Sequence, residues 1–151
     1  MTPPLMPYAL PETLAAELET VKAYWSGLLR GSADMPFADD LVLEALPDLA
    51  PSLALIEAFT LPERFRFSHI GAGLEAEQSK PLSDKFLDEV DLHFPFDFLR
   101  SQATAAVESG APNYHSQPAS ADGKHGAYER LILPLWGDGH TSLLLVAIHR
   151  R

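Results

Sequence analysis

The chain has 151 residues, of which 46% are hydrophobic, and this suffices to bury the core of one ordinary soluble domain. Its formal net charge of −10 argues against nucleic acid and anionic membranes as partners, because both attract cationic surfaces. Cysteine is absent, which excludes structural disulfides, zinc–thiolate sites, cysteine nucleophiles and iron–sulfur clusters.

The acidic residues are unevenly distributed along the chain. Residues 1–62 carry nine acidic and two basic side chains, whereas the remainder carries twelve acidic and nine basic ones. Acidic helices of this kind usually form a solvent-exposed face, and the more specific alternative is a docking surface for a basic partner. The start of the chain has neither the basic nor the apolar stretch of a signal peptide, and no run reaches the roughly 18 apolar residues of a membrane span. We therefore expect a cytoplasmic protein.

The first predicted element is a helix between Pro11 and Gly31, since proline suits the first turn of a helix and glycine suits its exit. Its apolar residues are spaced by four, three, four and three positions, which forms a seam along one side. The seam consists of Leu14, Leu18, Val21, Trp25 and Leu28. Packing on the chain's own sheet and a homodimer contact would bury the same residues, so both alternatives stay open at this point.

The remaining elements alternate between strand and helix patterns. A short helix is expected at Ala38–Leu46. A hairpin of two strands, at 53–59 and 64–70, follows it, because Phe65 and Phe67 alternate with polar residues in the second strand. The later expected elements are helices at 74–78, 84–90 and 96–109 and strands at 113–120, 128–136 and 141–149. This order predicts an α+β fold with a five-stranded antiparallel sheet, helices on one face and an N-terminal helical cap over residues 1–50. Residues 51–151 form the rest of one globular unit.

Few motifs indicate a chemical activity. Gly71 to Ala76 matches the dinucleotide pattern G-x-G-x-x-A, but Pro81 interrupts the following helix and the downstream strands look antiparallel, so we interpret these glycines as turn residues. The histidines form no i, i+4 pair on a predicted helix. His125 falls in a turn and is expected to be solvated, and for Arg130 a surface ion pair is weighed against a cavity position.

Four stretches of the sequence resemble the PAS domains, and in particular a bacterial family of short PAS-like proteins in which the domain stands nearly alone. The stretches are Trp25 with Leu29, Arg30 and Gly31; Met35 and Pro36 followed by acidic residues; Arg64 to Phe67 with Gly71; and Tyr128 to Leu135 with Asp138 and Gly139. Together they span about residues 20–149, and the last is the most specific. The resemblance implies a sensory or interaction module whose long helix and short helices enclose a small pocket.

The resemblance also implies which ligands such a pocket accepts. Light-sensing flavin chemistry needs a cysteine, which the chain lacks, and haem takes a histidine from the long helix, which contains none here. The cofactor is therefore unknown, and a small apolar metabolite, a protein partner or no ligand is expected instead. The pocket residues expected from the resemblance are His69, Phe86, Phe98, Gln102 and Tyr114; no catalytic and no metal site is expected.

Three functions compete at this stage. The leading hypothesis is a stand-alone, non-catalytic PAS-like signalling protein that binds a small ligand or a partner and acts in trans. The alternative is a small cone-like isomerase or hydrolase whose curved sheet brings Tyr114, His69 and an acid together, which would require a titratable pair within hydrogen-bond reach. The third is a structural homodimer built on the N-terminal seam.

Overall fold

A computed structural model describes residues 8–151 of the chain. Its centre is a five-stranded sheet with the strand order β2-β1-β5-β4-β3, in which every pair of neighbouring strands is antiparallel. The strands are β1 (Leu53–Phe59), β2 (Arg64–Ile70), β3 (Asn113–Gln117), β4 (Tyr128–Gly137) and β5 (His140–Arg150). The predicted α+β class and antiparallel sheet are confirmed, and the order of the strands agrees with a PAS-like arrangement.

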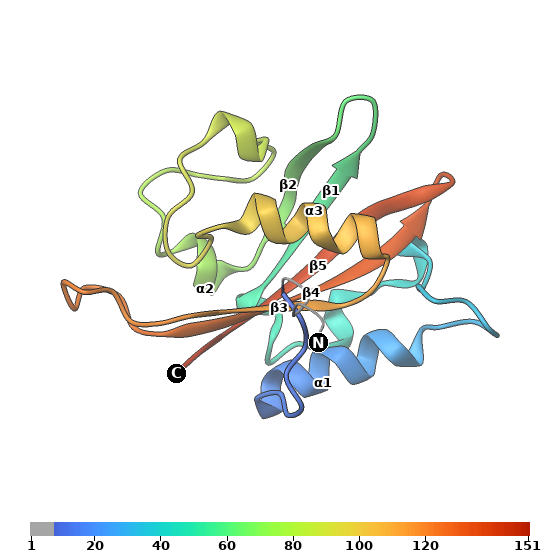
Figure 1. The fold of residues 1–151 in the computed structure, drawn as a ribbon, viewed down its shortest axis with the longest axis horizontal. Helices are drawn as coiled ribbons and strands as arrows, with labels where there is room; N and C mark the ends of the chain where they lie inside the picture. Colours follow the sequence, from blue (N-terminus) through green and yellow to red (C-terminus); the bar gives the residue numbers. More distant parts are fainter. Residues whose placement is uncertain (1–7) are drawn as a thin grey trace, which may run out of the picture.

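Helices cover both faces of this sheet (Figure 1). Within the described residues the α-helices are α1 (Ala16–Gly27), α2 (Ala72–Glu75) and α3 (Leu99–Ser109). Figure 1 shows α1 on one side of the sheet and, on the other side, α2, α3 and the loops between them. The crossover from β2 to β3 runs through α2 and α3, so it connects the two edge strands of the sheet.

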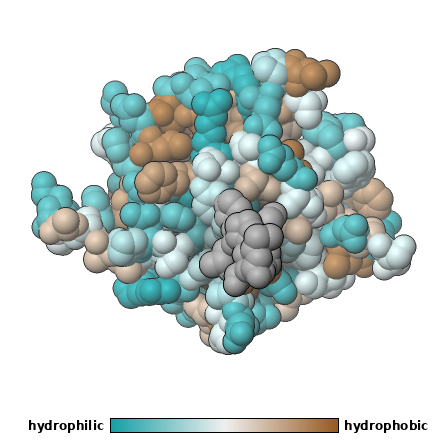
Figure 2. All heavy atoms as spheres, viewed as in Figure 1, coloured by the Kyte–Doolittle hydropathy of each residue, from teal (hydrophilic) through white to brown (hydrophobic). Residues whose placement is uncertain are grey.

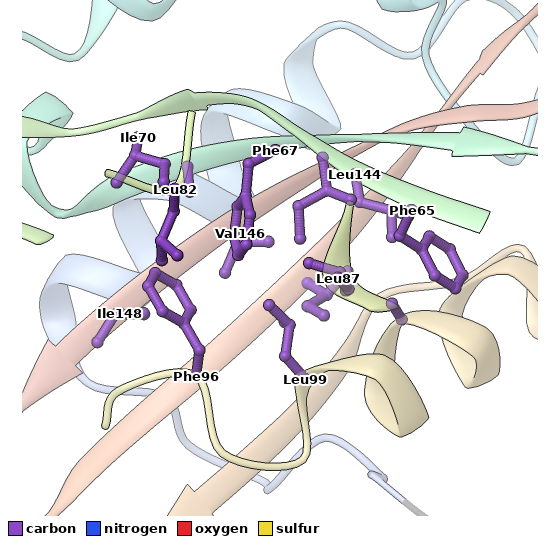
Figure 3. Close-up of a cluster of buried hydrophobic side chains, with 14 of the residues drawn as sticks. Phe65, Phe67, Ile70, Leu82, Leu87, Phe96, Leu99, Leu144, Val146 and Ile148 are labelled. Carbon is purple, nitrogen blue, oxygen red and sulfur yellow. The ribbon is translucent and has the colours of Figure 1, made fainter. Parts of the chain in front are cut away.

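The face below α3 is a closed apolar core. Phe67 and Phe96 are fully buried with their ring centroids 5.3 Å apart, and Leu99 of α3 packs into the same cluster. Figure 3 shows these side chains pointing toward one another from β2, β5 and the segment around α3. Because these side chains fill the space between α3 and the sheet, the middle of this face is packed like the interior of a folded domain.

The opposite face is covered by α1, which decides where the predicted seam lies. Leu18, Val21 and Trp25 are each at most 4% exposed and pack on β4 and β5 within the same chain. The indole nitrogen of Trp25 donates to the carbonyl of Pro134 at 2.8 Å. Leu14 and Leu28, at the two ends of the seam, are half-buried. The seam therefore forms the cap on the sheet, and a homodimer would need another surface; the oligomeric state itself stays a prediction.

Several predicted boundaries shift in the structure. The helix expected from Pro11 begins only at Ala16, and the helix expected at 38–46 is replaced by two short 3₁₀ turns, Ala38–Asp40 and Leu43–Ala45. The helix expected from Phe96 begins at Leu99, because Phe98 adopts a left-handed backbone conformation with φ of 59°. The first and third differences lie at helix ends, where assignments vary most, whereas the expected helix at 38–46 does not form as an α-helix.

The glycines of the G-x-G-x-x-A pattern have a packing role. A Cβ on Gly71 would lie 2.3 Å from the carbonyl oxygen of Ala50, and a Cβ on Gly73 would lie 2.9 Å from that of Pro51. Contacts this short do not occur between real atoms, so the turn around Ala50 can approach the start of α2 only because side chains are missing there. This agrees with the interpretation of these glycines as structural.

The molecular surface combines polar and apolar regions. On the face shown in Figure 2, hydrophobic residues gather over the loops between α2 and α3 and at the tip of the β1–β2 hairpin. Leu61, in that hairpin turn, is 98% exposed. Within residues 8–151, none of the helices combines the length and the apolar character that a membrane crossing requires.

Candidate functional site

The most unusual buried residue is an arginine. Arg130, near the start of β4, is fully buried on the face covered by α3. Its Nε donates to the side-chain oxygen of Gln102 at 2.7 Å, and its Nη1 and Nη2 donate to the carbonyls of Pro95 at 2.9 Å and Asp97 at 2.7 Å. A buried guanidinium is costly unless its donors are satisfied, and the planar fork of arginine suits acceptors placed around it. Arg130 thus ties the segment before α3 to the sheet.

Gln102 and Asn113 complete this network. The side-chain amide of Gln102 donates to Asn113 Oδ1 at 3.0 Å and to the carbonyl of Arg130 at 3.2 Å, while the amide of Asn113 donates back to the carbonyl of Gln102 at 3.0 Å. The two residues are at most 5% exposed. Because each side chain bonds to the others, α3, β3 and β4 are fixed relative to one another, and the network forms a rigid floor.

A cleft of about 230 Å³ lies beside this floor, between the segment before α3 and the loop joining β3 to β4. We call it the histidine cleft. It is lined by His93, Phe94, Asp97, Gln117, Pro118, Ser120, His125 and Gly126. The Tyr128 hydroxyl donates to the Asp97 carboxylate at 3.0 Å, so one wall is held by the strand that also carries Arg130. The cleft offers a carboxylate, two imidazoles, an amide and an aromatic ring to a small polar molecule.

Aromatic rings are stacked at the mouth of the histidine cleft. The His125 ring lies on the Phe94 ring with centroids 4.6 Å apart and an angle of 12° between the planes. Phe94 in turn meets Tyr128 edge-on at 5.2 Å, and Tyr128 is 6.3 Å from His115. Parallel stacking of a planar nitrogen ring on Phe94 is thus already present within the protein, with the loop from β3 to β4 supplying the ring.

Burial shifts the pKa values of the groups around the floor. Burial lowers the pKa of Arg130 to about 10, so the guanidinium stays charged at neutral pH. Burial raises the pKa of Tyr128, and its hydrogen bond to Asp97 adds to the rise. Burial, followed by the nearby charge of Arg130, lowers the pKa of His115, whose Nε2 lies 3.0 Å from Gln117 Oε1. His115 is therefore neutral at neutral pH, and Tyr128 acts as a hydrogen-bond donor.

The five pocket residues expected from the resemblance do not line one cavity among the described residues. Gln102 is buried in the Arg130 network. Phe98 is 63% exposed at the start of α3, and Phe86 lies at the outer edge of β2, where the Arg64 guanidinium sits 3.7 Å from its ring centroid. The space that an apolar ligand would need between α3 and the sheet is filled by the closed core.

His69 and Tyr114 lie on strands at opposite edges of the sheet. His69 is exposed on β2 and Tyr114 is half-buried on β3. Four strand spacings separate β2 from β3, which amounts to about 19 Å. The two side chains that the enzyme hypothesis combines therefore do not meet.

Tyr114 belongs to a second polar group on the face covered by α1. Its hydroxyl donates to Glu129, and Arg151 donates to the same carboxylate at 3.2 Å. Burial raises the pKa of Tyr114. Burial opposes the ionisation of Glu129, but the hydrogen bonds from Tyr114 and Arg151 outweigh it and lower the pKa of Glu129. This arrangement resembles a structural ion pair at the end of the sheet, since the carboxylate is satisfied by both neighbours.

The histidine cleft was not predicted from the sequence. His125 is exposed in a turn, as expected, but its stacking on Phe94 was not predicted, and neither Phe94 nor Asp97 was among the candidate residues. One signal was available, because Arg130 is a charged residue inside the apolar run Tyr128 to Leu135. A charge in such a run has to be either exposed or tied down by partners, and only the fold determines which.

The described residues were also searched for groups of metal ligands, and the chain was compared with known proteins. In the described part of the chain, no three His, Asp or Glu side chains gather closely enough to hold a metal ion. Comparison of the sequence with protein-family models gave no match, and comparison with curated proteins gave none either.

Proposed function

We propose that this protein is a non-catalytic, PAS-like sensory module that binds a small, polar, planar ligand in the histidine cleft and acts in trans. The observation that carries the proposal is the stack of His125 on Phe94 at the mouth of a cleft with a polar lining. A ligand ring that replaced His125 on Phe94 would keep the stacking contact and gain hydrogen bonds to Asp97 and Gln117.

The same geometry supplies a route for a signal. His125 belongs to the loop that joins β3 to β4, and Ser120 holds this loop together by accepting from the backbone N–H of His125 at 3.0 Å. The floor beneath is rigid because of the Arg130 network, so a ligand that displaced His125 would move the loop and leave the sheet unchanged. Ligand binding would thereby be converted into a change of one exposed segment.

The enzymatic alternative has less support. All three guanidinium nitrogens of Arg130 are bonded within the protein, so this cation orients the cleft wall and is not accessible to a substrate. The pair formed by Tyr114 and Glu129 lies on the opposite face, with Arg151 bonded to the carboxylate. Within the cleft, the Asp97 carboxylate accepts from Tyr128, and among the described residues no hydrogen bond joins it to His93 or His125, so no acid–base pair is formed there.

The test is a binding experiment with small planar probes. Imidazole, nicotinamide, uracil and adenine are titrated into ¹⁵N-labelled protein, and chemical-shift changes and melting temperature are recorded. We expect at least one probe to shift residues 93–97 and 117–126 and to raise the melting temperature. Phe94→Leu should abolish both effects. Phe59→Leu serves as the matched control, since Phe59 is a partly exposed aromatic residue at the end of β1. Probes that bind elsewhere, or none that bind at millimolar concentration, would contradict the proposal.

A further inference from the structure

A second hollow lies at the opposite end of β4, and its surroundings are apolar and acidic. It is lined by Ala33, Asp34, Met35, Phe37 and Trp136 and has a volume of about 300 Å³. We call it the Trp136 hollow. Trp136 is 38% exposed and Phe37 is 44% exposed, so two aromatic side chains stand at a surface where such residues are usually covered.

The two segments that carry the hollow are joined through their backbones. β3 pairs with β4 only as far as Ile132, which leaves the last residues of β4 without a neighbouring strand on that side. The segment after α1 takes this edge, because the backbone N–H of Trp136 donates to the carbonyl of Pro36 at 2.9 Å and Phe37 bridges to Trp136. The two exposed rings are thus carried by paired backbone. Figure 1 shows the segment after α1 running beside the β4–β5 hairpin.

The rim of the hollow is negatively charged. Asp34 lines it, Asp39 follows Phe37 closely, and Asp138 lies two residues after Trp136; all three are exposed. None of the ion pairs found within residues 8–151 includes any of the three. The nearby Arg30 is already paired with Asp40 at 2.8 Å, so it does not neutralise the rim.

Arg30 also illustrates the chemistry that this surface accepts. Its guanidinium lies 5.5 Å from the centroid of the Phe37 ring while Asp40 binds it through both oxygens. A cation held between an aromatic face and a carboxylate is therefore already formed beside the hollow, by a residue of the chain itself. Trp136 has no cation over its ring and Asp138 has no ion-pair partner within residues 8–151, and Asp138 lies two residues from Trp136 in the chain.

We propose that the Trp136 hollow is a docking site for a basic segment of another protein, which inserts one apolar side chain and places Lys or Arg next to Asp34 and Asp138. The volume suits a single large side chain, being at the lower end of ligand pockets. A second copy of this chain is a poor occupant, because its net charge of −10 would meet the same acidic rim. The proposal is independent of the ligand proposed for the histidine cleft.

The experiment selects the partner chemistry directly. A library of random 12-residue peptides displayed on phage is selected for binding to the wild-type protein. Phage that also bind the Trp136→Ser variant are removed, so that the remaining peptides depend on Trp136. We expect the enriched pool to combine net positive charge with one large apolar residue, and its affinity to fall at least tenfold between 50 mM and 200 mM salt. A pool without excess basic residues, or no pool that depends on Trp136, would overturn the proposal.

Defined variants then locate the contact. Binding of a selected peptide should protect Trp136 from acrylamide quenching, and Asp34→Lys combined with Asp138→Lys should weaken binding at least tenfold. Leu61→Ser and Glu108→Lys are the matched controls, because both residues are exposed and lie on other elements. Equal loss in the controls would contradict the assignment to this hollow. Circular dichroism and melting temperature verify that each variant is folded.

Discussion

Replacement of Arg130 tests whether the buried network holds the segment before α3. Arg130→Met keeps much of the side-chain volume but leaves the carbonyls of Pro95 and Asp97 and the side-chain oxygen of Gln102 without their donor. Each buried acceptor without a partner costs about 1–3 kcal/mol, so three of them cost about 3–9 kcal/mol. Part of this loss in stability is offset, because the variant no longer has to transfer a charged guanidinium from water into the core. We therefore expect a net loss of about 3–5 kcal/mol in unfolding free energy.

Urea unfolding followed by circular dichroism measures this loss. With a slope of about 2 kcal/mol per molar urea, the midpoint should fall by roughly 1.5–2.5 M. Arg130→Lys should fall in between, because one ammonium keeps the charge but cannot reach three acceptors around a planar fork. Arg64→Met is the control: Arg64 is partly exposed and pairs with Asp88, so its midpoint should change little.

A second measurement separates a local effect from general destabilisation. In Arg130→Lys, hydrogen exchange should increase first in residues 95–102, since the guanidinium binds this segment directly. If Arg130→Met lost less than about 1 kcal/mol, similar to the Arg64 control, the reasoning about orphaned buried acceptors would be refuted.

Three further predictions concern the cap, a titrating group and a close contact. Trp25→Phe should lower the unfolding free energy, measured by urea titration, by about 1–2 kcal/mol, because the buried hydrogen bond to Pro134 is lost. Trp25→Glu should leave the chain unfolded, because it places a charge in the core; a folded Trp25→Glu monomer would argue against the core position. The pKa of His115 in the folded protein is lowered from 6.5, so below this pH the unfolded chain binds more protons than the folded one. The unfolding free energy should therefore decrease as the pH falls below 6.5. An NMR titration of the His115 ring with its midpoint above pH 6.5 would contradict this. Gly71→Ala should lower the unfolding free energy, measured by calorimetry, by about 1–3 kcal/mol, because the added Cβ would collide with the Ala50 carbonyl. Gly27→Ala is the control and should not destabilise the protein, because no atom lies within 4 Å of the added Cβ.

The strands were predictable because their signals are local. Phe65 and Phe67 alternate with polar residues, and β1 and β2 occur over the predicted residues, 53–59 and 64–70. The expected turn residues Asp138 and Gly139 separate β4 from β5. Alternation and turn chemistry act between neighbours in the chain, so a single sequence contains this information.

The candidate site was less predictable because its residues come from distant parts of the chain. Phe94 and His125 are 31 residues apart, and nothing local to either one indicates that their rings stack. The resemblance suggested a pocket under α3, but the volumes of Phe67, Phe96 and their neighbours fill that space. Periodicity states which residues face inward; it does not state whether they leave room for a ligand.

By itself, the sequence determined the α+β class, the antiparallel pairing and the apolar side of α1, since each follows from spacing along the chain. Only the tertiary structure decided that Trp25 packs on the chain's own sheet, that Arg130 is buried with its donors satisfied, and that the polar cleft lies beside α3. The physical reason is that burial and hydrogen bonding of a side chain depend on which distant segments are brought against it, and this is settled by packing the whole chain at once.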